Sequence, residues 1–378
     1  MHSSIPVSKI ISAIVLMLIP FCVYAQDDES SDTLSLTFDR LFEEMTGQES
    51  DIDFDSDAYV YVNSQTPDAP FRRARRGIIV VGDRDTVRAM EPFSGPEANL
   101  VRYASTVNAY SRALGDSVTV YCMPIPTQVA FYCPEEAEEH TQDQYMAIRR
   151  IFRELDTQVV PVDIFPVLGE HANEPIYLRT DHHWAPLGAY YAAQEFAFSA
   201  MVPFRELDRF DSHEIPGFVG TMYGFSSDRR LKKAPETFVY YTPRDTPVET
   251  YYVNYRLDRS RKRIISVGDE ISGDFFIYAK GVATYCTFMG GDNKLTRIET
   301  KTDNGRRLAI LKDSYGNALP PYLFNSFEQI HVIDCRYFPL NIVDYLHENG
   351  ITDVLFANNM THATMMHTCD TYDSYLIQ

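Results

Sequence analysis

The sequence RLAILKDSYGN, residues 307–317, joins a short apolar run to a polar turn. Residues 307–311 suit a strand that is buried on both faces, and a helix is expected directly after the turn, near residues 318–324. A strand followed at once by a helix is the repeating unit of a parallel α/β sheet.

The same alternation recurs along the chain on both sides of this stretch. The expected strands are residues 77–82, 117–122, 158–163, 307–311, 330–334 and 353–357. The expected helices are residues 99–114, 142–155, 318–324, 340–349 and one that begins after Pro186. Together they predict an α/β fold with a doubly wound parallel sheet that helices cover on both faces.

The 378 residues divide into segments of different composition. Residues 1–25 form a predicted signal peptide, and residues 26–70 an acidic leader with one short amphipathic helix. Residues 71–378 form the α/β domain. Within it, residues 205–304 are rich in Tyr, Thr, Arg and Phe and in turn signals, which predicts a β-rich insertion with loops. One sheet with a long excursion accounts for the length better than two independent domains.

The N-terminus has the layout of a cleaved secretory signal. Lys9 precedes an apolar run over residues 10–19, and small residues end at Ala25. The run is shorter than the about 20 residues that span a bilayer, which argues against the alternative of a membrane anchor. A lipid-modified cysteine is preceded by a small residue, but Cys22 is preceded by Phe21, which argues against lipid modification of Cys22. We therefore expect a periplasmic or otherwise exported protein.

The charge balance restricts the partners. The formal net charge is −19, and removing residues 1–25 takes away one lysine and no acid, which gives −20. Such a protein is a poor partner for nucleic acid and suits neutral or sugar-like substrates. Of the six cysteines, Cys122 and Cys133 form the nearest pair apart from the signal segment, and the sequence leaves their pairing open.

Ser314 lies at the junction of the strand 307–311 and the following helix. Ligand crevices form at the carboxyl ends of such strands, and a helix N-terminus stabilises a developing oxyanion. Ser314 is therefore a candidate nucleophile. The alternative is that Ser314 only caps the helix.

A base for this serine is offered by the tetrapeptide Asp181-His182-His183-Trp184. Side chains two residues apart in an extended segment lie on the same side, so Asp181 can accept the Nδ1 proton of His183. Nε2 of His183 then takes a proton from a hydroxyl. His182 points the other way and is a substrate-side candidate, while Trp184 either walls the site or packs in the core.

The same tetrapeptide could instead hold a metal ion, because carboxylate and imidazole are common ligands. Adjacent histidines diverge in an extended segment, and no further acidic or histidine cluster completes a ligand set. The sequence therefore favours a site with no metal and no organic cofactor.

The DHHW tetrapeptide followed by a helix, and the later Lys312-Asp-Ser-Tyr-Gly-Asn317, resemble the DHHW family of exported bacterial proteins. That family is similar to the SGNH-hydrolase-like domains of periplasmic alginate O-acetylation proteins. The resemblance covers roughly residues 77–378. It implies a flavodoxin-type sheet in circularly permuted order, with Asp181 and His183 ahead of Ser314 as a catalytic triad.

The resemblance also implies three oxyanion donors, namely the serine N–H, a glycine N–H and an asparagine side chain. Ser314 supplies the first, and Gly291 and Asn293 are the candidates for the others. Gly220 is a further glycine, Asn358 and Asn359 follow the last strand, and Tyr315 is a substrate-side candidate.

The implied function is a serine-dependent O-acetyltransferase or acetylesterase that acts on an exopolysaccharide or cell-surface glycan. Possible partners are the glycan or acyl-ester substrate, a membrane acyltransferase and other polysaccharide-assembly proteins. The alternative is a catalytically silent glycan-binding or assembly protein, for which the tyrosines of the β-rich segment would supply stacking surfaces. The sequence leaves open the choice between transfer and hydrolysis, because both use one covalent intermediate.

Overall fold

The computed structural model describes residues 68–257, 264–338 and 340–377. Everything below concerns the unit that contains these residues, 62–378. The signal peptide and nearly all of the acidic leader lie outside the described residues and stay predictions.

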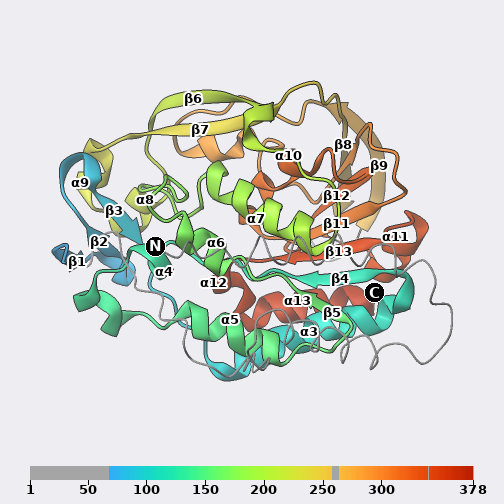
Figure 1. The fold of residues 1–378 in the computed structure, drawn as a ribbon, viewed down its shortest axis with the longest axis horizontal. Helices are drawn as coiled ribbons and strands as arrows, with labels where there is room; N and C mark the ends of the chain where they lie inside the picture. The colour runs from blue at the N-terminus through green and yellow to red at the C-terminus, as the bar shows by residue number, and fades with distance from the viewer. Residues whose placement is uncertain (1–67, 258–263, 339, 378) are drawn as a thin grey trace, which may run out of the picture. The chain divides into compact units, whose positions relative to one another are not determined.

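The main element is an eight-stranded sheet with the order β5-β4-β13-β11-β12-β10-β8-β9 (Figure 1). Its parallel part consists of β5 (Val159–Pro161), β4 (Thr119–Cys122), β13 (Asp353–Ala357), β11 (Arg307–Lys312) and β12 (Gln329–Asp334). Its antiparallel part consists of β10 (Leu295–Glu299), β8 (Glu249–Leu257) and β9 (Ile264–Gly273). The sheet is therefore mixed: the expected parallel strands are extended by three antiparallel strands from the segment 205–304.

Helices cover both faces of the parallel part, which explains why its strands are continuous apolar runs. One face carries α3 (Glu97–Leu114), α5 (Gln144–Arg153), α11 (Ile342–Glu348) and α13 (Met366–Leu376). The other carries α7 (Pro186–Ser199) and α10 (Pro320–Leu323), drawn above the sheet in Figure 1. All five residues of β13 are buried between these layers. The helices expected within residues 71–378 are all present.

The expected strand 77–82 does not join this sheet. It forms β2 (Ile79–Val81), which pairs with β1 (Phe71–Arg73) and β3 (Arg88–Met90) in a separate antiparallel sheet. The apolar side chains of this sheet pack against Met222 and Leu231 instead. A short apolar run indicates burial, but it does not specify the strand with which it pairs.

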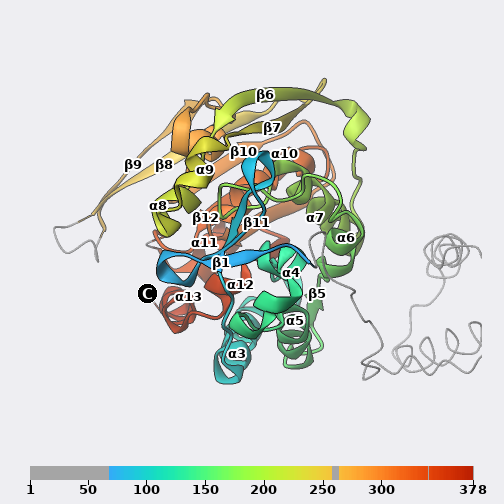
Figure 2. The ribbon, with the colours of Figure 1, turned by 90° about the vertical axis from the view of Figure 1, so that its left-hand side faces the viewer.

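The segment 205–304 is rich in antiparallel strands, as expected. β6 (Phe210–Phe218) and β7 (Glu236–Pro243) form a ribbon that packs on α7 and α10. Figure 2 shows this ribbon on the side of the domain opposite α3, α5 and α13. β8, β9 and β10 extend the main sheet because β10 pairs with the edge of β12. The description of the segment as an insertion stays a prediction.

The order of the strands places the site. From β11 the chain passes through α10 to β12, which lies on one side of β11. On the other side of β11 lies β13, which follows β12 in the chain. Where neighbouring strands connect in opposite directions, a crevice forms outside their carboxyl ends. Ser314 follows β11, and Asn358 and Asn359 follow β13, so all three lie at this edge.

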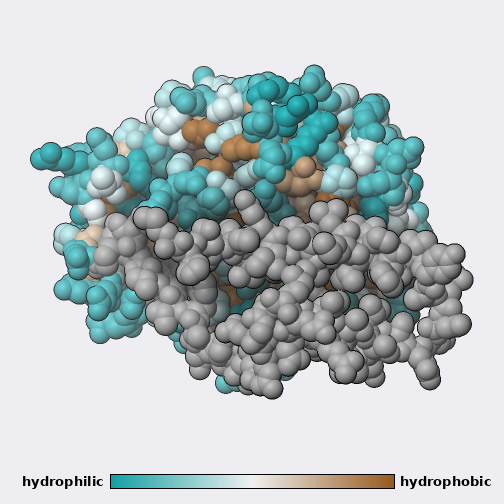
Figure 3. All heavy atoms as spheres, in the orientation of Figure 1, coloured by the Kyte–Doolittle hydropathy of each residue, from teal (hydrophilic) through white to brown (hydrophobic). Residues whose placement is uncertain are grey.

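The described residues contain no helix that is long and apolar enough to cross a membrane. Apolar residues form only small patches on the described surface visible in Figure 3. The five described cysteines are all free thiols, so Cys122 and Cys133 are not joined.

Candidate active site

Asp181, His183 and Ser314 form one hydrogen-bonded chain. Nδ1 of His183 lies 2.5 Å from Oδ1 of Asp181, and Nε2 lies 2.7 Å from Oγ of Ser314. His183 and Ser314 are 131 residues apart in sequence. Asp181 and His183 are buried, whereas Ser314 is partly exposed. The structure thus brings together the three residues in which sequence reasoning placed the chemistry.

The carboxylate of Asp181 is held from a second side by the loop before α8 (Met222–Ser226). Its Oδ2 accepts the backbone N–H of Thr221 at 2.8 Å and the Thr221 hydroxyl at 2.9 Å. Burial by itself would raise the pKa of Asp181, but His183 and the Thr221 N–H outweigh it and hold this pKa well below its usual range. Asp181 is therefore an ionised acceptor.

Gly220 lies directly against this carboxylate. A Cβ at Gly220 would meet Oδ2 of Asp181 at 2.4 Å, and its N–H donates to Oγ1 of Thr180 at 3.1 Å. Its N–H is therefore engaged, and the glycine serves close packing around Asp181 rather than an oxyanion hole.

The imidazole of His183 is fixed by Tyr285, which sequence reasoning missed. The two rings stack with centroids 3.8 Å apart and an interplanar angle of 5°. Nε1 of Trp184 donates to the Tyr285 hydroxyl at 3.1 Å and to the carbonyl of Tyr315 at 3.0 Å. Trp184 is fully buried, so it supports the site from behind and is not on the substrate side. Nothing in the sequence around Tyr285 indicates this role.

The turn that carries Ser314 is capped by Asp313. The Asp313 carboxylate accepts the N–H of Tyr315 at 2.9 Å and that of Asn359 at 2.8 Å. Ser314 begins a short 3-10 helix (Ser314–Ala318) rather than an α-helix, and its side chain is not the cap. The cap by Asp313 leaves the Ser314 hydroxyl available to His183 and ties the end of β11 to the end of β13.

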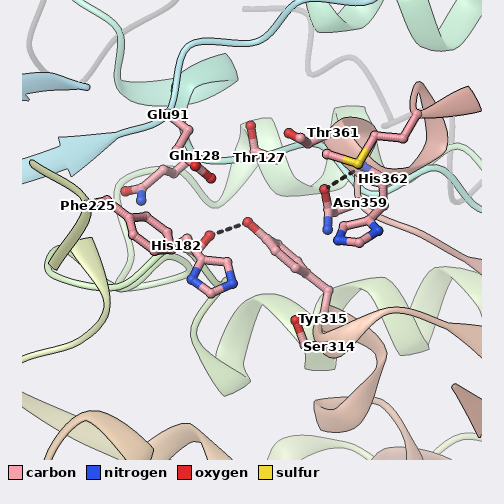
Figure 4. Close-up of a pocket in the computed structure, with 11 residues that line it drawn as sticks. Glu91, Thr127, Gln128, His182, Phe225, Ser314, Tyr315, Asn359, Thr361 and His362 are labelled. Carbon is pink, nitrogen blue, oxygen red and sulfur yellow. Dashed lines mark hydrogen bonds between the residues drawn. The ribbon is translucent and has the colours of Figure 1, made fainter. Parts of the chain in front are cut away.

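A cavity of about 210 Å³ opens beside Ser314 (Figure 4). Its lining includes Ser314, Tyr315, His182, Glu91, Asn359 and His362. Tyr315 contributes mainly its ring, because its hydroxyl donates to the backbone carbonyl of His182. His182 and Tyr315, the substrate-side candidates, thus both line this cavity. The expectation that His182 points away from His183 was wrong, because the two rings lie side by side with centroids 3.8 Å apart.

Gly291 and Asn293 are engaged within their own loop. The N–H of Gly291 donates to Phe288 at 3.0 Å, and Nδ2 of Asn293 donates to Met289 at 2.6 Å. Neither residue lines the cavity. The expectation that they supply oxyanion donors was wrong, because their donors are already used in stabilising the turn.

Asn359 is the better placed amide. Its Oδ1 accepts the N–H of His362 at 3.2 Å, while no partner holds its Nδ2 among the described residues. Figure 4 shows Asn359 in the cavity wall, with its oxygen turned to His362.

The grouping of Asp181, His182 and His183 also has the spacing of a metal site, with one ligand atom from each within 4.8 Å of the others. In the described structure Asp181 already binds His183 and Thr221, and Nδ1 of His182 lies 2.7 Å from Oγ1 of Thr221. These contacts already use both oxygens of Asp181 and Nδ1 of both histidines.

Burial and the neighbouring His183 lower the pKa of His182 from 6.5 to about 3. The unfolded chain takes up this proton as the pH falls through 6.5, but the folded protein does so only near pH 3. Stability is therefore lost over that window, by about 2 kcal/mol between pH 7 and pH 5. We expect urea unfolding of a His182→Gln variant to lose about that much less on the same change of pH. His331 has the same shift but is present in both proteins and cancels. An equal pH dependence in both would contradict the assignment.

Comparison with known proteins gives a family and a fold. The family model described as DHHW protein matches residues 75–333. The crystal structure of a DHHW family protein from Eubacterium siraeum is 38% identical, covers 82% of this chain and 98% of its own, and superposes with a TM-score of 0.72. No curated protein matches.

More distant structures are also similar, and among them PatB1 shares the fold. PatB1 from Bacillus cereus, solved with a sulfonyl adduct, is 19% identical over 78% of this chain and 96% of its own, with a TM-score of 0.58. The O-acetyltransferase domain of AlgJ from Pseudomonas putida is 14% identical over 78% of this chain and 99% of its own, with a TM-score of 0.44. The family match and the Eubacterium siraeum structure decide the assignment: this chain belongs to the DHHW family.

Proposed function

We propose that this protein is a serine-dependent O-acetyltransferase or acetylesterase that acts on an exported or cell-surface glycan. The observation that carries the proposal is the continuous hydrogen-bonded chain from Asp181 through His183 to Ser314, which ends at a cavity. This is the arrangement that turns a weakly nucleophilic hydroxyl into an effective nucleophile.

In the first step, the Ser314 oxygen attacks the acyl carbon and its proton moves to Nε2 of His183. Asp181 stays ionised and stabilises the imidazolium. When the tetrahedral intermediate collapses, the C–O bond to the alcohol breaks and His183 returns the proton to that alcohol. In the second step, a sugar hydroxyl or water gives its proton to His183 and attacks the acyl carbon. The bond between that carbon and Oγ of Ser314 then breaks, and His183 returns the proton to Ser314. This releases the new ester or the free acid.

The proposal assigns two donors to the negative oxygen of the intermediate. The N–H of Ser314 stands at the first position of its 3-10 helix, where backbone donors have no partner within the helix. Nδ2 of Asn359 comes from the neighbouring strand end. Donors fixed in advance at the developing charge make a large contribution to catalysis, typically about 10²–10³-fold for one side-chain donor.

We also propose that the sheet is an SGNH-like, flavodoxin-type sheet in circularly permuted order. The order of the parallel strands supports this. If the strands are counted from β11, then β12, β13, β4 and β5, the spatial order is 2-1-3-4-5, which is the flavodoxin order. Export to the periplasm, and work beside a membrane acyltransferase or other assembly proteins, are further parts of the proposal and rest on the sequence.

The experiment that tests the proposal is covalent labelling with an aryl sulfonyl fluoride, chosen because PatB1 has been solved with a sulfonyl adduct. We expect intact-mass spectrometry to find one sulfonyl group on the protein, mapped to Ser314 and absent in Ser314→Ala. The matched control is Ser105→Ala, which removes an exposed hydroxyl of α3 and should label like the wild type.

An absence of labelling in folded wild-type protein, together with no release of acetate from 4-nitrophenyl acetate, would contradict the proposal. That result would favour the alternative of a silent glycan-binding protein. Labelling at another serine would contradict the assignment of the nucleophile.

A further inference from the structure

His182 is the member of the DHHW tetrapeptide that the proposed reaction does not use. Its ring lies beside that of His183, with centroids 3.8 Å apart, and lines the cavity on the side opposite Asn359 and His362 (Figure 4). Its Nδ1 lies 2.7 Å from Oγ1 of Thr221.

The proton positions around Thr221 follow from its partners. The hydroxyl has one proton, and it lies 2.9 Å from Oδ2 of Asp181, an ionised carboxylate that can only accept. Thr221 therefore donates to Asp181 and must accept from Nδ1–H of His182. The imidazole of His182 is neutral, so its Nε2 carries no proton and is a hydrogen-bond acceptor. One carboxylate thus sets the tautomer of both histidines.

The charged residues around the cavity are consistent with a wall that accepts hydrogen bonds. Glu91 lines it, and the lining contains no lysine or arginine among the described residues. Arg76 lies outside the lining, with its guanidinium over the ring of Phe225. Gln128 offers no free donor, because its amide nitrogen already donates to the carbonyls of Ala89 and Asp181.

We propose that His182 and Glu91 form a subsite that accepts hydrogen bonds from hydroxyl groups and selects a neutral sugar residue over a uronate. This proposal rests on the proposed function in one respect: it takes the cavity to be the place where the sugar reacts. While His183 handles the reacting hydroxyl, Nε2 of His182 accepts from a neighbouring hydroxyl of the same ring. The cavity is below the size range of drug-sized pockets, so it takes one sugar residue with its acyl group.

A carboxylate on the sugar would meet Glu91 and an unprotonated nitrogen, with no lysine or arginine in the cavity lining to balance it. Leaving a charge unpaired at a partly buried site costs more than losing a neutral hydrogen bond. The subsite therefore discriminates by an unfavourable contact with the anion as well as by a favourable one with the hydroxyl.

The test measures binding and needs no turnover. Calorimetry on the Ser314→Ala protein compares cellotetraose with tetragalacturonic acid. We expect cellotetraose to bind at least about tenfold more tightly. Adding Glu91→Gln should reduce that preference severalfold, whereas adding Glu135→Gln, the same charge change at an exposed position, should not. This control separates the subsite from the general repulsion of anions by an acidic protein.

Adding His182→Leu should weaken binding of cellotetraose about 5- to 10-fold, the effect of one hydrogen bond. His171→Leu, at a histidine that pairs with Glu174 and is not in the cavity lining, should leave binding unchanged. Thr221→Val keeps the imidazole of His182 but removes its orienting partner, and should weaken binding as well. Thermal unfolding checks that each variant is folded.

The subsite is refuted if tetragalacturonic acid binds as tightly as cellotetraose, or if folded His182→Leu and Thr221→Val proteins both bind cellotetraose like the parent. Both results are independent of whether Ser314 reacts with the sulfonyl fluoride, so the two proposals fail separately.

Discussion

Replacing His183 with alanine is expected to lower kcat/KM for 4-nitrophenyl acetate by at least about 10⁴-fold. The reason is that Nε2 of His183, 2.7 Å from Oγ of Ser314, is the placed acceptor for the serine proton. Without it the hydroxyl keeps its proton at neutral pH, and the leaving alcohol also loses its proton donor. Initial rates over a range of ester concentrations give the value.

Two further variants test whether Asp181, His183 and Ser314 act as one catalytic unit or whether the substitution only disturbs the structure of the site. Residues that act as one unit are not additive, so His183→Ala combined with Ser314→Ala should be no slower than either change alone. Asp181→Asn keeps the shape of the carboxylate but removes its charge, and should also cost several orders of magnitude. His171→Ala, a matched change outside the cavity, should leave the rate unchanged. A His183→Ala protein within tenfold of wild type, with unchanged thermal stability, would rule out the proposed role.

The second large effect concerns Lys312, the residue two before the serine. Its Nζ lies 2.8 Å from Oδ2 of Asp334, and both side chains are almost completely buried. Burial by itself would raise the pKa of Asp334, but Lys312 and Arg336 outweigh it and lower this pKa. Gly316 of the serine turn packs on the stem of Lys312, since a Cβ there would lie 2.4 Å from the Lys312 Cβ.

Lys312→Met keeps the length of the side chain and removes its charge. We expect a loss of about 3–5 kcal/mol in the free energy of unfolding, because a buried carboxylate loses one of its balancing charges. The measurement is urea unfolding at pH 7 followed by circular dichroism. The matched control is Arg112→Met, which breaks an exposed pair with Asp156 and should cost about 1 kcal/mol or less. Equal losses in the two variants would contradict the view that burial makes the Lys312 pair important.

Much of the fold could be predicted because buried strands and helices have local apolar patterns in the sequence. The strands β4, β11, β12 and β13 are apolar runs, and α3 and α5 lie close to their expected limits. The sequence did not show in which sheet β2 lies, because its three apolar residues indicate that the strand is buried but not with which strand it pairs. Nor did it show that β8 to β10 extend the main sheet, since pairing with β12 depends on strands far apart in the chain.

The candidate site divides in the same way. The spacing of Asp181 and His183 was enough to place both on one side of an extended segment, and the position of Ser314 after β11 followed from the alternation of strands and helices. Only the tertiary structure decided the partners from other segments, namely Thr221 and Gly220 at Asp181, Tyr285 on the ring of His183 and Asn359 beside Ser314.

The physical reason is the range of the interactions. Periodicity and turn residues act over a few positions, so the sequence by itself determined which segments are strands or helices and which side chains share a face. Contacts between distant segments depend on strand order and on the packing of loops. Sequences with the same local pattern of strands and helices can differ in both. Gly291 and Asn293 fitted the pattern of oxyanion donors, but their donors are used within their own turn, whereas Asn359 at the end of β13 lines the cavity beside Ser314.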